Sequence, residues 1–147
     1  MSVTRIAWII VGVALVVNFA WADVNLPNVA LFTTGGTIQS KGAHRQKLME
    51  YSDGKVKPQE LLDDLPELKT VANLSVTEIS NIGSGGMNTK LLLKLAKGIN
   101  AALAKPDVAG AVVTHGTGTL EETAYFLNLV VKSDKPVVVV GAMRPFT

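Results

Sequence analysis

Hydrophobic positions in this chain fall into short uninterrupted runs that are separated by polar stretches. Three runs show no alternation of polar and apolar residues, and the last two are rich in valine: 29–34, 108–115 and 135–143. A run of this kind is typical of a strand that is buried on both faces. Residues 74–82 alternate in part and predict a weaker strand.

Helical patterns lie between these runs. Residues 88–105 open on an asparagine, which favours an N-cap, and then carry leucine and isoleucine at spacings of one, three and four. Residues 119–132 begin with Thr119 and have Glu122 three positions later, an arrangement that predicts a capping box. Residues 57–68 predict a short helix that is ended by Pro66. Strands that alternate with helices at this spacing indicate an α/β fold with an open, mainly parallel sheet and flanking helices.

The amino-terminal residues have the pattern of a secretory signal. Arg5 precedes an uncharged apolar stretch, residues 6–17, and the triplet Ala-Trp-Ala stands at 20–22. A basic start, an apolar stretch and small residues at the end predict a signal peptide over residues 1–22, with cleavage before Asp23. The alternative is an uncleaved membrane anchor, because the extended apolar stretch approaches the roughly 20 residues that span a bilayer. Both alternatives predict an exported domain, periplasmic or secreted, and cleavage would leave it free of the membrane.

Composition narrows the chemistry of the remaining residues 23–147. Removing Arg5 with the predicted signal lowers the formal net charge from +2 to +1, which argues against a nucleic-acid partner. The chain contains no cysteine, so thiol chemistry and disulfides are excluded. The two histidines, His44 and His115, lie far apart in the sequence, and we therefore predict no zinc or other metal site.

Glycine, serine and threonine follow each predicted strand. The four stretches are TTGGT at 33–37, NIGSGGMN at 81–88, THGTGT at 114–119 and GAMRP at 141–145. In an open parallel sheet, the carboxyl ends of the strands lie along one rim, where ligands bind. We therefore expect these stretches to face one place.

Two kinds of chemistry suit such a rim. Glycine-rich loops and helix N-termini can bind phosphate, but the chain has neither the GK[ST] nor the GxGxxG pattern of the nucleotide-binding loops. A threonine hydroxyl can also attack a carbonyl when a base removes its proton, while nearby backbone amides hold the oxyanion. Composition alone leaves open which threonine would act.

Three motifs together resemble the bacterial L-asparaginase family, in particular its secreted type II form. They are TTGGTI at 33–38, THGTGTLEETAYFLNLVV at 114–131 and KPVVVVGAMRP at 135–145, and the similarity extends over residues 26–147. The resemblance implies hydrolysis of L-asparagine to L-aspartate and ammonia, with L-glutamine as a possible second substrate. It also implies that no cofactor is used, that the full-length protein is a homo-oligomer, and that residues 23–147 are an incomplete amino-terminal asparaginase domain.

Matching the family's motifs assigns roles to four residues. Thr37 becomes the nucleophile, Tyr51 its partner on a loop, Ser84 the group that binds the substrate's α-carboxylate, and Thr117 the second hydroxyl. Three of them have a structural alternative: Thr37 and Ser84 are common turn or cap residues, and Tyr51 could pack as a half-buried aromatic clasp. His115 is interpreted as a structural residue that is hydrogen-bonded at the end of its strand.

Three departures from the family pattern change the expectation. Gly118 stands where the family has an aspartate that holds the substrate's α-amino group, and Gly85 stands where it usually has glutamine. Both glycines are therefore candidate substrate-binding positions that lack a side chain, and weak binding of an amino acid is expected. The resemblance also puts the lysine of the second triad and the carboxyl-terminal domain beyond Thr147. Two hypotheses remain: an L-asparagine amidohydrolase, or a non-catalytic asparaginase-like fragment.

Overall fold

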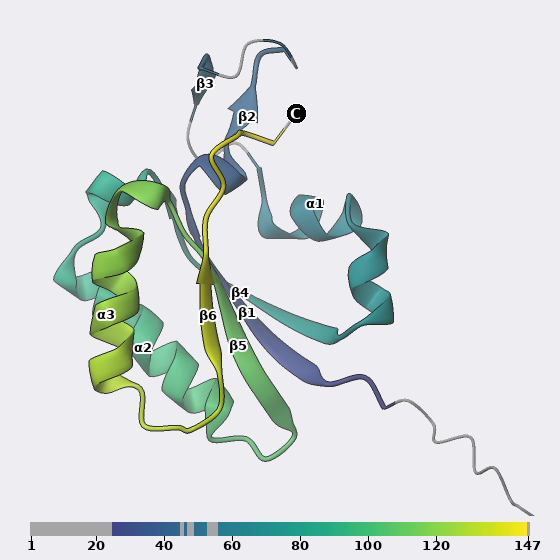
Figure 1. Ribbon diagram of the computed structural model, residues 1–147, viewed down its shortest axis with the longest axis vertical. Coiled ribbons are helices and arrows are strands. Elements are labelled where there is room, and N and C mark those ends of the chain that lie inside the picture. Colours follow the sequence, from purple (N-terminus) through teal and green to yellow (C-terminus); the bar gives the residue numbers. More distant parts are fainter. Residues whose placement is uncertain (1–24, 45, 47–48, 53–55, 147) are drawn as a thin grey trace, which may run out of the picture.

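The computed structural model is an α/β arrangement built on a parallel sheet (Figure 1). It describes residues 25–44, 46, 49–52 and 56–146. The predicted signal peptide, residues 1–22, lies outside the described residues. Four strands form the main sheet in the order β4-β1-β5-β6, and every neighbouring pair is parallel. Their bounds are β1 Asn28–Gly35, β4 Asn73–Ile82, β5 Val108–Thr114 and β6 Val137–Val140.

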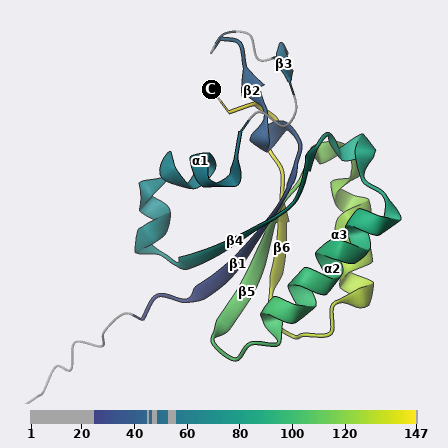
Figure 2. The same ribbon diagram turned by 180° about the vertical axis from the view of Figure 1, so that it is seen from behind.

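Two long helices cover one face of this sheet, and a short helix lies on the other side (Figures 1 and 2). The long ones are α2 Thr89–Leu103 and α3 Leu120–Val130, and the short one is α1 Pro58–Asp63. Single turns of 3₁₀ helix occupy the connections: η1 Thr37–Gln39, η2 Pro66–Thr70, η3 Ser84–Gly86 and η4 Thr117–Thr119. No helix in the described part of the chain is both long and apolar enough to cross a bilayer. The α/β prediction is confirmed.

The core lies between the sheet and the two long helices. Phe32 of β1 and Val113 of β5 are buried against Leu95 and Ile99 of α2 and Leu127 of α3. Burying a side chain of this size stabilises the fold by about 1.5–3 kcal/mol. The apolar spacing along α2 therefore fixes which face of that helix meets the sheet, and with it the position of the turns at the sheet's carboxyl rim.

The burial of β6 differs from the prediction. Its residues alternate in exposure, and Val138 and Val140 are 55% and 39% exposed. The prediction of burial on both faces was wrong for this strand, because β6 is at the edge of the sheet and only its α3 side is covered in the described structure. A continuous valine run has no polar position to reveal which face is open.

Both predicted helix starts are confirmed, but only one of the two predicted side-chain caps is formed. Asn88 caps α2, since its Oδ1 accepts a hydrogen bond from the Leu91 N–H at 3.2 Å. Thr119 makes no capping bond to α3 and instead donates its hydroxyl to the Ser84 carbonyl at 3.1 Å. The nearby turn after β4 thus competes for the hydroxyl that a capping box would use. Helix α1 ends at Asp63, and Pro66 begins η2.

The polar stretch after β1 contains a small antiparallel hairpin. Strands β2 Lys41–Gly42 and β3 Tyr51–Ser52 pair with each other beyond the rim of the main sheet (Figure 1). The carboxyl-terminal segment runs beside this hairpin: Phe146 donates its N–H to the Ser40 carbonyl at 2.8 Å and accepts from the Gly42 N–H at 3.3 Å. The hairpin is thereby attached to the end of the described chain.

Candidate active site

Three glycine-rich turns meet at the carboxyl rim of the sheet with their backbones in close approach. A Cβ added at Gly36, after β1, would lie 2.3 Å from the Gly116 Cα, after β5. One added at Gly116 would lie 2.7 Å from the Ser84 Cβ, after β4. Side chains at these glycines would force the three turns apart.

These turns enclose an open cavity of about 290 Å³. Five of its lining residues are candidates named from the sequence, Thr37, Tyr51, Ser84, Gly85 and Thr117, and Gly118 lies next to it. The turn after β6, predicted to face the same place, contributes no lining residue among those described. The cavity is lined by Gly36, Thr37, Tyr51, Gly83, Ser84, Gly85, Gly116 and Thr117.

Two hydroxyl groups meet in this cavity. Thr37 is the first residue of η1, directly after the glycine turn, and Tyr51 belongs to β3 of the hairpin. Their oxygens are 3.2 Å apart, within hydrogen-bonding distance, and either can be the donor. The Tyr51 side chain remains 40% exposed. The threonine proton can therefore be relayed through the phenol hydroxyl to a basic group of a bound molecule, which is one way to activate a hydroxyl nucleophile.

The turn that presents Thr37 is held by hydrogen bonds on both sides. Gly35 and Gly36 have positive φ angles of 102° and 82°, a conformation that favours glycine. The Gly36 N–H donates to the Ile82 carbonyl at 2.9 Å, and the Ser40 hydroxyl donates to the Gly36 carbonyl at 2.9 Å. The Gly35 N–H donates to the side chain of Gln39 at 2.9 Å. Gln39 and Ser40 were missed by the sequence analysis, and polar residues directly after a glycine turn were the available signal.

Ser84 joins the turns that follow β4 and β5. Its hydroxyl oxygen accepts the Gly118 N–H at 3.2 Å, and its carbonyl accepts the Thr119 hydroxyl at 3.1 Å. The alternative in which Ser84 caps the turn before α2 is wrong, because the N-cap position of that turn, η3, is Gly83 and no side chain caps it. Ser84 Oγ still carries a hydrogen of its own, which it can donate into the cavity that it lines.

His115 is fully buried directly behind the cavity. Its Nδ1 lies 2.8 Å from the Gly116 carbonyl oxygen, and its Nε2 lies 3.0 Å from the Thr123 hydroxyl. Because a carbonyl can only accept, Nδ1 carries the proton and Nε2 accepts from Thr123; this tautomer is inferred from the hydrogen bonds. Both ring nitrogens are occupied within the fold, in agreement with the structural interpretation of His115.

The described lining offers hydroxyls and backbone groups, with no charged side chain among its members. Within the described ranges, no three His, Asp or Glu side chains gather where they could hold a metal ion. The chemistry that this arrangement supports is attack by a hydroxyl on a neutral carbonyl, with N–H and O–H groups available to stabilise developing negative charge.

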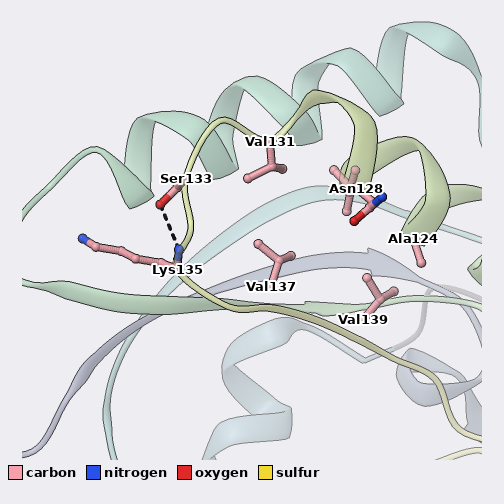
Figure 3. Close-up of a pocket in the computed structure, with 8 residues that line it drawn as sticks. Ala124, Asn128, Val131, Ser133, Lys135, Val137 and Val139 are labelled. Carbon is pink, nitrogen blue, oxygen red and sulfur yellow. Dashed lines mark hydrogen bonds between the residues drawn. The ribbon is translucent and has the colours of Figure 1, made fainter.

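A second cavity of about 320 Å³ lies between α3 and β6 (Figure 3). Ala124 and Asn128 of α3 face Val137 and Val139 of β6, and the Lys135 N–H donates to the Ser133 hydroxyl at 3.2 Å. This cavity is as large as the rim cavity, but its lining has no paired hydroxyls and no glycine turn. The rim cavity is therefore the candidate active site.

Comparison with known proteins agrees with the motifs. A family model described as asparaginase, N-terminal, matches residues 28–147. The chain is 55% identical over 123 residues to L-asparaginase 2 of Bacillus subtilis (strain 168), which covers 84% of this chain and 33% of that protein. It is 51% identical over 134 residues to L-asparaginase 2 of Escherichia coli (strain K12), covering 91% of this chain and 38% of that one.

A solved structure with the same arrangement is a probable cytoplasmic L-asparaginase from Campylobacter jejuni. Its TM-score is 0.77 at 44% identity, over 81% of this chain and 36% of that one. The chain thus spans about a third of the length of the curated relatives it matches. On the family model, the two relatives and the shared fold together, the chain belongs to the asparaginase family and contains sequence of its amino-terminal domain.

Proposed function

We propose that this chain carries the nucleophilic part of an L-asparaginase site. The observation that carries the proposal is the 3.2 Å contact between the Thr37 and Tyr51 hydroxyls in the rim cavity. Thr37 Oγ attacks the side-chain amide carbon of L-asparagine while a proton is relayed through the Tyr51 hydroxyl: Tyr51 accepts the Thr37 proton and gives its own hydroxyl hydrogen to the amide nitrogen. The C–N bond then breaks, ammonia leaves with that proton, and water hydrolyses the resulting ester to release L-aspartate and restore Thr37.

The other lining residues bind the substrate in this proposal. Ser84 donates its hydroxyl hydrogen to the α-carboxylate, and Thr117 supplies the second hydroxyl. Gly85 and Gly118 flank the end of the substrate that carries its α-amino and α-carboxylate groups. The two relatives named L-asparaginase 2 support asparagine as the substrate, and L-glutamine is the second candidate. We also propose that the full-length protein is a homo-oligomer.

We also propose that the protein is of type II and is periplasmic or secreted. This part rests on the signal-like residues 1–22 alone, because the relatives differ: the solved one from C. jejuni is named cytoplasmic. Mass spectrometry of the purified mature protein tests it: a first residue of Asp23 supports export with cleavage, and a retained Met1 supports the anchor or a cytoplasmic protein.

The alternative is a non-catalytic asparaginase-like chain. Gly118 favours it, because this position offers no side chain to an amino-acid ammonium group and its N–H donates to Ser84. An ammonium that loses its water in a cavity without an anionic partner is bound weakly.

Ammonia release from L-asparagine by the full chain tests the proposal. We expect Thr37→Ala to lower the rate by about 10³-fold or more, as removal of a nucleophile does in other hydrolases. Thr70→Ala is the matched control, because Thr70 is exposed on η2 and bonds only locally, to the Glu67 carbonyl. Equal rates for Thr37→Ala and the unmodified chain would rule out Thr37 as the nucleophile, and absence of release from all three chains would favour the non-catalytic alternative.

A further inference from the structure

A fully buried glutamine lies where the hairpin leaves and rejoins the sheet domain. Gln39 has an exposed fraction of zero, and both ends of its amide are hydrogen-bonded. Its Oε1 accepts the Gly35 N–H at 2.9 Å, and its Nε2 donates to the Val56 carbonyl at 3.3 Å. Its backbone carbonyl also accepts the Val56 N–H at 3.1 Å. One residue therefore bonds to the glycine turn before Thr37 and to the chain that returns from Tyr51.

Other contacts hold the same hairpin at different places. The Asn81 side chain donates to the Val56 carbonyl at 3.2 Å and so attaches the returning chain to β4. Phe146 pairs with the outgoing chain at Ser40 and Gly42. Neither of these contacts involves the glycine turn itself. Gln39 differs because it joins that turn to the returning chain directly.

The burial of Gln39 has a free-energy cost that its hydrogen bonds must offset. An amide group without partners in the interior is destabilising, whereas an apolar side chain of similar size fills the same space without this cost. Through these two hydrogen bonds, the buried Gln39 amide holds Gly35 and Val56 in place relative to each other. Thr37 is two residues after Gly35, and Tyr51 is five residues before Val56.

We propose that Gln39 is a positioning residue that keeps the Tyr51 hydroxyl within reach of the Thr37 hydroxyl. It does so by holding the returning end of the hairpin against the turn that presents Thr37. The catalytic meaning of this role rests on the proposed function, in which Thr37 and Tyr51 are the reacting pair. The contact itself is a property of the fold and can be measured without turnover.

Fluorine NMR of the full chain tests the role, because the chain has two tyrosines, Tyr51 and Tyr125. After incorporation of 3-fluorotyrosine, Tyr51→Phe identifies the Tyr51 signal by its loss. We expect Gln39→Met, which keeps the size and removes both hydrogen-bonding groups, to move the Tyr51 signal toward its position in the unfolded chain. The signal of Tyr125, exposed on α3, should stay in place, and a cooperative thermal melt of the variant shows that the fold is intact.

Two further variants sharpen the result. Gln59→Met is the matched control, since Gln59 is exposed and its side chain bonds only to Asp63 in the same helix; we expect no change in either signal. Gln39→Glu keeps the acceptor for the Gly35 N–H but replaces the donor to Val56 by an oxygen. We expect it to move the Tyr51 signal as Gln39→Met does. An unmoved Tyr51 signal in either folded Gln39 variant would overturn the proposal.

Hydrogen exchange on the unmodified chain decides the matter if both Gln39 variants unfold. The Gly35 N–H donates to the Gln39 side chain, whereas the Ala43 N–H donates to the Glu50 carbonyl in the outer hairpin at 3.3 Å. We expect exchange at Gly35 to be slower than at Ala43 by about tenfold or more. Exchange at Gly35 as fast as at Ala43 would overturn the proposal.

The same samples separate this inference from the proposed function. A moved Tyr51 signal together with no ammonia release from the unmodified chain supports the positioning role and counts against the hydrolase. Ammonia release that depends on Thr37, together with an unmoved Tyr51 signal in Gln39→Met, supports the hydrolase and overturns the positioning role.

Discussion

At the scale of single residues, two glycines of the rim cavity differ in the space around them. Gly36 combines φ 82° and ψ −171°, a region that is essentially restricted to glycine, with a neighbouring backbone 2.3 Å from an added Cβ. Gly85 lies in η3, and nothing is within 4 Å of an added Cβ. The same substitution should therefore have very different effects at the two positions.

We expect Gly36→Ala to lower the free energy of unfolding by about 1–3 kcal/mol from backbone strain alone, and by more once the contact with Gly116 is included. Gly85→Ala should change it by less than about 0.5 kcal/mol. Urea unfolding of both variants checks this. A Gly36→Ala chain as stable as Gly85→Ala would show that the turn can relax.

Substitution of Gly118 is expected to change the affinity for the substrate. An added Cβ would meet the Ser84 Oγ at 3.0 Å, a contact that a small rotation of the serine relieves. We expect Gly118→Asp to supply a carboxylate for the substrate's ammonium group, a charge-assisted bond of about 1.5–3 kcal/mol. This corresponds to a fall of about 10- to 150-fold in KM for L-asparagine.

Gly118→Ala is the control for that change, because it adds the same Cβ without the charge. Steady-state ammonia release measures KM for both variants, and isothermal titration with L-aspartate measures binding if turnover is absent. Equal binding by the alanine and aspartate variants would mean that position 118 does not contact the ammonium group.

At the scale of elements, Asn100 connects the two long helices. Its Nδ2 donates to the Ala96 carbonyl within α2 at 3.0 Å and to the Val130 carbonyl at the end of α3 at 3.2 Å. Its Oδ1 accepts the Lys132 N–H at 2.8 Å. The side chain thus provides hydrogen-bond partners for backbone groups that have none within the helix at the end of α3.

Replacing Asn100 by alanine should cost about 1–3 kcal/mol of the free energy of unfolding, because the partly buried Val130 carbonyl and the exposed Lys132 N–H both lose this partner. Asn128→Ala is the comparison, since Asn128 is exposed on α3 and its substitution should cost less than about 0.5 kcal/mol. Thermal melts of both variants measure the difference. Similar melting temperatures would show that the contact between the helices contributes little.

At the scale of the whole molecule, the sheet face opposite α2 and α3 leaves apolar residues exposed. Val138 is 55% exposed beside an apolar groove of about 200 Å³, and Val140 is 39% exposed on the same edge strand. An edge strand with an apolar face favours association between chains. The groove is lined by Pro27, Val29, Ala109, Gly110, Ala111, Val112, Pro136 and Val138.

We therefore expect the apparent mass of this chain, measured by light scattering, to rise with concentration. Val138→Lys should shift the population toward the monomer, since it places a charge on the open face. Val71→Lys adds the same charge at a valine that is 59% exposed after η2 and does not line that groove, and it should have a smaller effect. A monomer at every concentration in the unmodified chain would contradict this prediction.

Several strands and helix ends of this protein follow from patterns within short stretches of its sequence. Continuous runs without polar alternation predicted β1 and β5, and Asn88 predicted the start of α2, because strand burial and helix capping depend on neighbouring residues. The family motifs pointed to Thr37 and Tyr51. Their 3.2 Å contact supports that hypothesis, although the motifs contain no distance.

Tertiary structure alone decided the features that depend on residues far apart in the chain. Thr119 bonds to Ser84 in place of a capping partner, and β6 exposes one face because no described element covers it. Gln39 becomes a buried link only when Gly35 and Val56 lie on either side of it. Local sequence patterns indicate which secondary structure each segment favours. Which polar group receives which partner is settled when the segments pack together, since every buried donor and acceptor then competes for the groups within its reach.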